Sequence, residues 1–249
     1  MSGHSKWANI RVRKGKMDAL RGKTFTKLTK EIIVAAREGG GNPETNLRLK
    51  KAIDKAKQNN LPKDNIEKGI KKGTGELPGV NYEAHTYEGY GSGGVAVLID
   101  VLTDNKQRTI AEIRHILTKH GGSMGEAGCV AWMFKRKGVI FVDKASVDEE
   151  KLFTLVIDAG AEDMRTEESS YEIYTEPQDF EKVKQALQQN NIAMTSAEVT
   201  MLPQSSVPVE GKNAEQVLKL MNDLEDHDDI QNVYANFDIS EKVMEAVGV

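Results

Sequence analysis

The sequence predicts an α+β protein of three domains: an N-terminal all-helical domain and two α+β domains of ferredoxin-like kind, one inserted in the other. Apolar residues recur at helical spacing up to about residue 78, and strand-like alternation begins at Tyr82. From Val139 onwards, strands and helices alternate in the order βαββαβ. A chain of 249 residues is long enough for two or three such domains.

Residues 1–79 are the predicted helical domain. The first 23 residues show weak apolar periodicity, which predicts an arm or a short, loosely docked helix. A helix over 24–38 follows and ends at three glycines. The next helix is predicted to start with Asn42 as N-cap and Pro43 in its first turn, and a third follows Leu61-Pro62. The predicted buried faces are Phe25, Leu28, Ile32 and Ala35 or Ala36, then Leu49, Ala52, Ile53 and Ala56, then Ile66 and Ile70.

The first α+β domain is predicted to be discontinuous. Its first part contains only the elements ββαβ and lacks a closing helix and strand. Its closing helix and strand are expected after Pro208. We therefore expect residues 80–135 and 204–249 to form one domain. Its predicted elements are strands over 82–90 and 94–103 joined by Gly91-Ser92-Gly93, a helix over 107–119, a strand over 129–134, a helix over 213–224 and a strand over 230–239.

The inserted domain is predicted over residues 136–203, after a hinge at Lys135-Arg136-Lys137-Gly138. It is expected to place a four-stranded antiparallel sheet against two helices. Its predicted elements are strands over 139–142, 163–166, 171–175 and 193–201, and helices over 149–159 and 179–190.

Charge is divided sharply along the chain. Residues 1–80 hold 19 Lys and Arg against 8 Asp and Glu, whereas the remainder holds 15 against 30. The net charge of -4 hides this division. A strongly basic end of this kind indicates a polyanionic partner, because clustered Lys and Arg neutralise phosphates and release counterions. A solvated charged face is the alternative interpretation.

The candidate nucleic-acid contacts lie in the basic domain. Trp7 stands beside Lys6 and could stack on a base, although a packing role explains a tryptophan equally well. The acidic remainder of the chain is expected to orient the basic domain or to meet a protein partner. The predicted contact residues are Lys6, Trp7, Arg11, Arg13, Lys14, Lys16, Arg21, Lys23, Lys27, Lys30, Arg48, Lys51 and Lys55.

Two glycine-rich stretches are candidates for binding loops. Gly89–Gly94 lies between two strands and lacks the helix and motif of a phosphate loop, which favours a hairpin turn. The connection between the helix over 107–119 and the next strand is a candidate second contact loop, with a flexible connection as the alternative. Its residues are Gly121, Gly122, Ser123, Met124 and Gly125.

No arrangement of residues indicates catalysis or a metal site. The acidic run Asp223–Asp229 lacks EF-hand spacing and is predicted to be a solvated helix end. His115 and His120 are not spaced as zinc ligands on one helical face. The single cysteine, Cys129, excludes an internal disulfide and is predicted to be a core residue. We expect no cofactor and no small-molecule substrate.

The location expected from the sequence is cytoplasmic. A single cysteine fits a reducing compartment. The N-terminus has no apolar signal-peptide core, and no apolar run is long enough to span a membrane. We therefore expect no membrane contact.

Five segments of the chain form a recognisable signature: 1–10, 23–28, 61–66, 87–91 and 224–230. Together they resemble the YebC/PmpR family, and the resemblance covers essentially the whole chain. The resemblance implies a helical domain and two α+β domains, one inserted in the other. Many members are regarded as DNA-binding transcriptional regulators, mitochondrial relatives are translational activators, and bacterial relatives help ribosomes through proline-rich stretches.

The resulting expectation is a non-enzymatic regulator of gene expression that binds nucleic acid through its basic domain. Its target would be DNA, in transcription, or ribosomal RNA, in translation. A scaffold whose basic face docks on an acidic protein is the alternative from another class. A metal-dependent nuclease built on Asp223–Asp229 is the third hypothesis.

Overall fold

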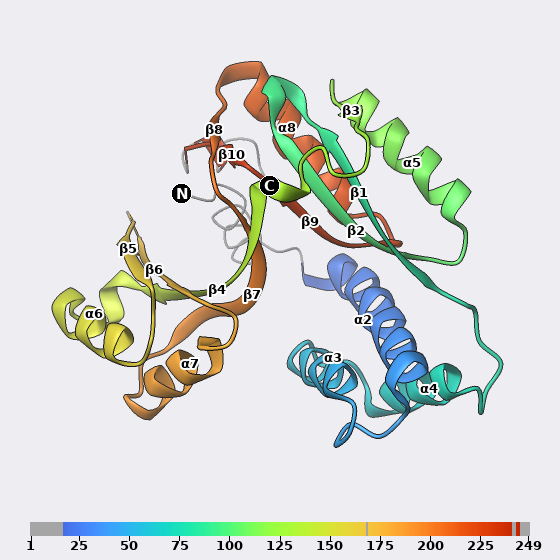
Figure 1. Cartoon of the computed structure of the whole chain (residues 1–249), viewed down its shortest axis with the longest axis horizontal. Helices are drawn as coiled ribbons and strands as arrows, with labels where there is room; N and C mark the ends of the chain where they lie inside the picture. The colour runs from blue at the N-terminus through green and yellow to red at the C-terminus, as the bar shows by residue number, and fades with distance from the viewer. Residues whose placement is uncertain (1–16, 168, 241–242, 245–249) are drawn as a thin grey trace. The chain divides into compact units, whose positions relative to one another are not determined.

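The computed structural model describes residues 17–167, 169–240 and 243–244 and confirms an α+β protein (Figure 1). The chain divides into two compact units. One contains the described parts of 1–131 and 206–249, and the other contains the described parts of 132–205. The first unit holds the helical region and one sheet, and the second unit holds a second sheet with its own helices.

The helical region consists of α2 (Met17–Gly39), α3 (Leu47–Gln58) and α4 (Lys63–Thr74). Helix α2 begins earlier than expected and includes residues predicted to form an arm, because a nucleated helix propagates without an apolar stripe. Gly73 lets α4 approach α2, since a Cβ there would lie 2.5 Å from the carbonyl oxygen of Ile33. The predicted stripes form one core of Leu28, Ile32, Ala35, Ala36, Leu49, Ala52, Ile53, Ala56, Leu61 and Ile66, with Phe25 and Ile70 packed against it.

Helix α3 starts four residues later than expected, because Asn46 and not Asn42 is its N-cap. The Asn46 side-chain oxygen accepts a hydrogen bond from the Leu49 N–H at 3.0 Å. Its amide group also donates to the carbonyl oxygens of Ala35, at 2.7 Å, and Gly40, at 2.8 Å. One buried side chain therefore fixes the start of α3 to the end of α2.

The sheet of the first unit has the order β3-β1-β2-β9, and all its pairs are antiparallel. Helices α5 and α8 contact each other and pack on strands of this sheet. The predicted hairpin is confirmed: a 3-10 turn over Ser92–Gly94 joins the first two strands. The elements are β1 (Glu83–Tyr90), β2 (Ala96–Thr103), α5 (Lys106–Lys119), β3 (Ser123–Met124), α8 (Gly211–Glu225) and β9 (Ile230–Ala235).

Two strand predictions in this unit are wrong. No strand covers 129–133: Ala131–Met133 form a 3-10 turn, and the short strand β3 pairs with β1 instead. The strand expected over 230–239 breaks at Asn236, whose side-chain oxygen accepts a hydrogen bond from the Ala96 N–H at 2.7 Å. After the break, β10 (Phe237–Asp238) pairs in parallel with β8 (Val207–Pro208).

The second unit has the predicted βαββαβ order, with sheet order β5-β6-β4-β7. Helices α6 and α7 contact each other, and their buried residues share a core with the sheet. The predicted hinge at Lys135–Gly138 is wrong, because these residues pair with β7 inside a long strand. The elements are β4 (Phe134–Asp143), a 3-10 turn (Lys144–Ser146), α6 (Glu149–Asp158), β5 (Asp163–Thr166), β6 (Ser170–Thr175), α7 (Phe180–Gln189) and β7 (Met194–Pro203).

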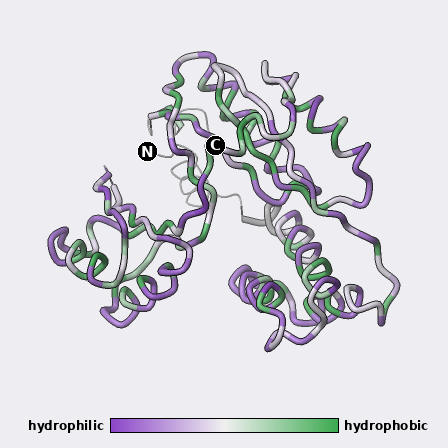
Figure 2. Tube along the Cα trace, in the orientation of Figure 1, coloured by the Kyte–Doolittle hydropathy of each residue, from purple (hydrophilic) through white to green (hydrophobic). Residues whose placement is uncertain are grey.

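Hydropathy follows this architecture. Strand β2 is buried along almost its whole length, whereas α3 is hydrophilic apart from its inner stripe (Figure 2). Among the described residues, no helix combines the length and the apolar character needed to cross a membrane.

Candidate nucleic-acid interface

Helix α3 separates its apolar and basic residues onto different faces. Leu49, Ala52, Ile53 and Ala56 are buried against the other helices, at i, i+3, i+4 and i+7. The lysines occupy the remaining positions and are exposed. They are Lys50, Lys51, Lys55 and Lys57.

Helix α4 has the same construction. Its buried residues are Ile66, Gly69 and Gly73, and its lysines lie outside them. Only one of these ammonium groups has an acidic neighbour within the described residues: Lys63 lies 3.5 Å from Glu67. The exposed lysines of α4 are Lys63, Lys68, Lys71 and Lys72.

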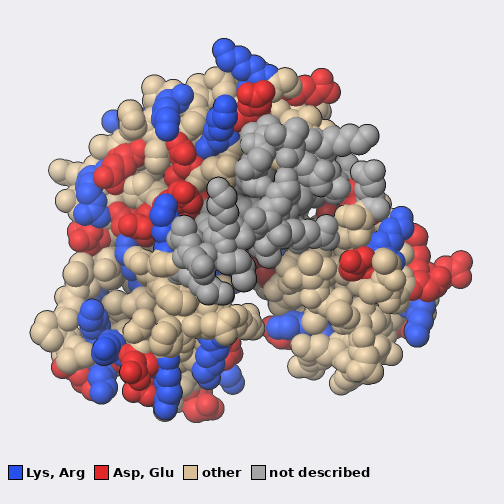
Figure 3. Space-filling model, turned by 180° about the vertical axis from the view of Figure 1, so that it is seen from behind, with Lys and Arg blue, Asp and Glu red and all other residues tan. Residues whose placement is uncertain are grey.

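The lysine face, defined as these eight lysines of α3 and α4, is a concentration of uncompensated charge. Residues 47–74 hold nine Lys and Arg against three Asp and Glu, in a chain of net charge -4. Figure 3 shows Lys and Arg side chains standing out on the helical region, at lower left, with some acidic side chains among them. Charge of this kind attracts a polyanion and binds phosphate without reading sequence.

Arg48 is exposed beside this face but is already occupied. Its guanidinium donates to Glu31 at 2.9 Å and also pairs with Glu38. The hydrogen bond to Glu31 is the main reason that the pKa of Arg48 is raised. The guanidinium therefore ties α3 to α2.

Three predicted contacts on α2 are also occupied, by carboxylate or carbonyl groups far away in the sequence. The Lys23 ammonium lies 3.2 Å from a carboxylate oxygen of Asp226. Lys27 donates to the main-chain carbonyl of Glu225. Lys30 is buried and lies 2.6 Å from a carboxylate oxygen of Asp229. These lysines join the helical region to the end of α8 and the turn that follows it.

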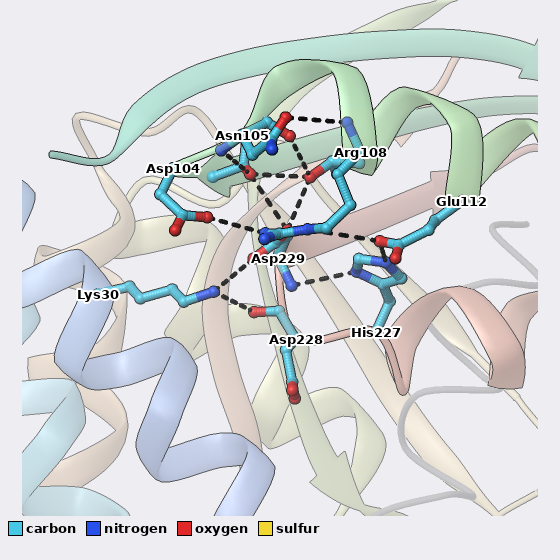
Figure 4. A network of polar contacts seen from close by, with 10 residues as sticks. Lys30, Asp104, Asn105, Arg108, Glu112, His227, Asp228 and Asp229 are labelled. Carbon is cyan, nitrogen blue, oxygen red and sulfur yellow. Dashed lines mark hydrogen bonds and ion pairs between the residues drawn. The ribbon is translucent and has the colours of Figure 1, made fainter. Parts of the chain in front are cut away.

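Asp229 is the centre of a buried polar network (Figure 4). Besides Lys30, its carboxylate accepts hydrogen bonds from Arg108 at 2.8 Å and from the Thr109 hydroxyl at 2.7 Å. Burial alone would raise the pKa of Asp229, but hydrogen bonds from Lys30, Thr109 and Arg108 hold the pKa far below its ordinary value. The hydrogen bond to Asp229 in turn raises the pKa of Arg108. One carboxylate thus links α2, α5 and the α8–β9 turn.

The acidic run was predicted to be a solvated helix end, and this prediction is wrong for Asp229. Asp223 also has partners, since it lies 2.8 Å from Lys119 and 2.8 Å from His120. The ligand atoms of Glu112, His227 and Asp229 lie within 4.8 Å of one another. Two cationic side chains already occupy the Asp229 carboxylate, which disfavours a metal ion there.

The segment that follows the candidate second contact loop is bound by a buried acid, Glu88. Its carboxylate accepts hydrogen bonds from the N–H groups of Gly128 at 2.6 Å, Val130 at 2.6 Å and Ala131 at 2.8 Å. Burial would raise the pKa of Glu88, but these hydrogen bonds lower it. Cys129 lies in this segment, half-buried and outside any strand.

The loop residues themselves lie between α5 and this segment. Gly121 has φ +74, and a side chain at Gly122 would collide with the Tyr90 carbonyl. Ser123 and Met124 form β3, and Gly125 packs against Cys129. The role of the loop as a second contact loop stays a prediction.

The predicted contacts fall into four groups. Lys51 and Lys55 belong to the lysine face, whereas Lys23, Lys27, Lys30 and Arg48 have acidic or carbonyl partners. Arg21 lies in α2, with its side chain outside the described atoms. The sequence interpretation missed Lys50, Lys57 and all four lysines of α4, which a count of lysines outside the apolar stripes would have found. Outside the described residues lie Lys6, Trp7, Arg11, Arg13, Lys14 and Lys16.

Comparison with known proteins assigns both parts of the chain to one family. Residues 5–76 match the N-terminal domain of the TACO1/YebC protein. Residues 82–237 match the TACO1/YebC second and third domain.

Several similar proteins share a name. A "Probable transcriptional regulatory protein" of Natranaerobius thermophilus is 59% identical over 248 residues, which cover 98% of this chain and 99% of the relative. A protein of the same name from Dictyoglomus thermophilum is 58% identical and covers 99% of this chain and 100% of the relative.

A solved structure has the same fold. It is a conserved hypothetical protein from Aquifex aeolicus, 49% identical in sequence, with a TM-score of 0.78. The match covers 91% of this chain and 93% of that one. With the family models and the close relatives in agreement, the chain belongs to the TACO1/YebC family.

Proposed function

We propose that this protein is a non-enzymatic regulator of gene expression that binds nucleic acid through the lysine face of α3 and α4. The observation that carries the proposal is a set of eight exposed lysines that are uncompensated apart from Lys63, in a chain that is acidic as a whole. The basic residues of 1–21, predicted from the sequence as contacts, contribute further phosphate contacts in this proposal.

The side chains of the lysine face suit phosphate contacts more than base recognition. An ammonium group is a point charge, whereas guanine recognition uses the planar fork of arginine. In the described helical region, Arg48 is held by two glutamates and Arg37 donates to Asn81 and Val80. We therefore expect affinity that depends strongly on salt and weakly on sequence.

DNA is the proposed target, in transcription, because the relatives are named transcriptional regulatory proteins. Ribosomal RNA, in translation, is the alternative, since its phosphates would satisfy the same lysines. Crosslinking in cells, followed by sequencing of bound DNA and RNA, separates the two. Promoter fragments support transcription, and enrichment of ribosomal RNA in their place would contradict the DNA target.

A protein-interaction scaffold would use the same charge on an acidic protein. Binding of the purified full chain to duplex DNA and to ribosomes, at low salt, distinguishes this possibility. Binding to either supports the nucleic-acid proposal, and binding to neither would overturn it.

The absence of catalysis is part of the proposal. A metal-dependent nuclease would need the carboxylates of the acidic run as ligands, but Asp229 is held by Lys30 and Arg108, and Asp223 by Lys119 and His120. Duplex DNA should therefore stay intact during long incubation with the protein and Mg²⁺ or Mn²⁺. Metal-dependent cleavage that co-purifies with the protein would contradict this.

A further inference from the structure

Three lysines of α2 face the acidic end of α8 with graded exposure. Lys23, Lys27 and Lys30 are spaced at i, i+4 and i+7, so they lie along one side of the helix. The Lys23 side chain is 44% exposed, whereas the Lys30 side chain is 9% exposed. The contact therefore runs from the surface into the interior.

The inner contact is structural. Lys30 lies 2.6 Å from the Asp229 carboxylate and donates to the Asp228 carbonyl at 3.0 Å. Lys27 donates to the carbonyl of Glu225, the last residue of α8, where the helix dipole favours a cation. A phosphate cannot reach Lys30 without opening this buried interface.

The outer contact differs, because both partners are accessible. Lys23 lies 3.2 Å from Asp226, and the side chains are 44% and 48% exposed. An exposed ion pair contributes only about 0–1 kcal/mol. A phosphate group offers the ammonium the same kind of anionic oxygen as a carboxylate, so the two can exchange.

We propose that Asp226 competes with nucleic-acid phosphates for Lys23, so that the acidic turn over 225–229 withholds this lysine from binding. This inference rests on the proposed function. Nucleic-acid phosphates can bind the uncompensated lysines of α3 and α4 without displacing a carboxylate. To bind Lys23, a phosphate must displace the Asp226 carboxylate. The acidic turn thereby limits binding that is driven by charge alone.

Asp228 provides a matched control for Asp226. Both are exposed aspartates in the same turn, and each loses one negative charge when replaced by asparagine. Lys30 contacts the main-chain carbonyl of Asp228, while the Asp228 carboxylate points away from it (Figure 4). Any effect of net charge alone is therefore shared by the two variants.

The test measures binding of the full chain to a short duplex DNA over a range of salt concentrations. Asp226→Asn is expected to bind up to about fivefold more tightly than Asp228→Asn, the ceiling set by an exposed ion pair. Its plot of log affinity against log salt should be steeper by about 0.9, the value for one added phosphate contact. Equal affinities and slopes for the two variants would overturn the inference.

Lys23→Ala, made in both backgrounds, identifies the lysine responsible. It should change affinity little in the native chain and should abolish the gain in Asp226→Asn. A gain that survives the loss of Lys23 would assign it to another group and overturn the inference. If the native chain binds no duplex DNA at low salt, the proposed DNA-binding function itself fails, and the inference fails with it.

Discussion

The Lys30 ammonium lies 2.6 Å from a carboxylate oxygen of Asp229, and both side chains are buried, although the residues are 199 positions apart in the sequence. Arg108 and Thr109 bind the other carboxylate oxygen. The ion pair connects the helical region that carries the lysine face to the sheet that follows it. Its strength decides how firmly that face is held within its unit.

Asp229→Asn is expected to lower the free energy of unfolding by about 3 kcal/mol, because it leaves the Lys30 ammonium buried without a counter-charge. Lys30→Met should cost less, since Asp229 keeps its hydrogen bonds from Arg108 and Thr109. Urea unfolding of the full chain measures both values. A larger loss for Lys30→Met than for Asp229→Asn would contradict this account of the network.

Stability should fall on acidification because of Asp229. The folded-state pKa of Asp229 lies below its ordinary value. The ionised carboxylate therefore contributes stability above the unfolded-state pKa of about 3.9, and this contribution is lost as the pH falls towards the folded-state pKa. Unfolding free energies between neutral pH and about pH 3 should show a smaller decrease for Asp229→Asn than for the native chain. Parallel curves for the two proteins would refute the assignment.

Glu88→Gln should loosen the segment that follows β3. The amide keeps one acceptor oxygen in place of two charged ones, so N–H groups of Gly128, Val130 and Ala131 lose partners, at a cost of about 1–3 kcal/mol. Hydrogen exchange at Val130 and Ala131 measures the change directly. Glu126→Gln, an exposed substitution in the same segment, is the control and should leave exchange unchanged.

Asn46→Ala should destabilise the helical region by about 1–2 kcal/mol, because Asn46 caps α3 and also binds the carbonyl of Ala35. Asn42→Ala should have a smaller effect, since the Asn42 side chain accepts one exposed hydrogen bond, from the Glu44 N–H. Thermal unfolding of the two variants ranks them. A larger destabilisation by Asn42→Ala than by Asn46→Ala would contradict the assignment of Asn46 as the N-cap of α3.

Hydrophobic periodicity predicted correctly the helices and strands whose pattern is visible in the local sequence. It failed where contacts with residues far away in the sequence determine the structure. Leu49, Ala52, Ile53 and Ala56 were predicted correctly as a buried stripe, because the 3.6-residue repeat is visible within one helix. Asn42 and Asn46 both suit an N-cap, and the choice depends on a hydrogen bond to Ala35 that no local pattern contains.

The strand predicted over 129–134 failed for a similar reason. Its apolar residues fit a strand, but Glu88, from β1, binds the N–H groups of Val130 and Ala131 that a strand would have used. The ion pair between Lys30 and Asp229 could not be predicted from the sequence either. The helical periodicity of α2 identifies Lys30 as a basic position but does not show which residue it contacts. Charge composition therefore predicted a basic region correctly, but not which of its lysines are available.

The most direct test of the central proposal compares two variants with equal loss of positive charge. The first replaces Lys50, Lys51, Lys55 and Lys57 of α3 with glutamine, and the second replaces four exposed lysines elsewhere, Lys106, Lys144, Lys151 and Lys182. Affinity for duplex DNA is measured against salt for each full-length protein. The α3 variant should bind at least about tenfold more weakly than the native protein. The slope of its log affinity against log salt concentration should become shallower by about 0.9 for each lysine that contacts a phosphate. The affinity and slope of the second variant should stay close to those of the native protein. Equal weakening of the two variants would contradict binding through the lysine face.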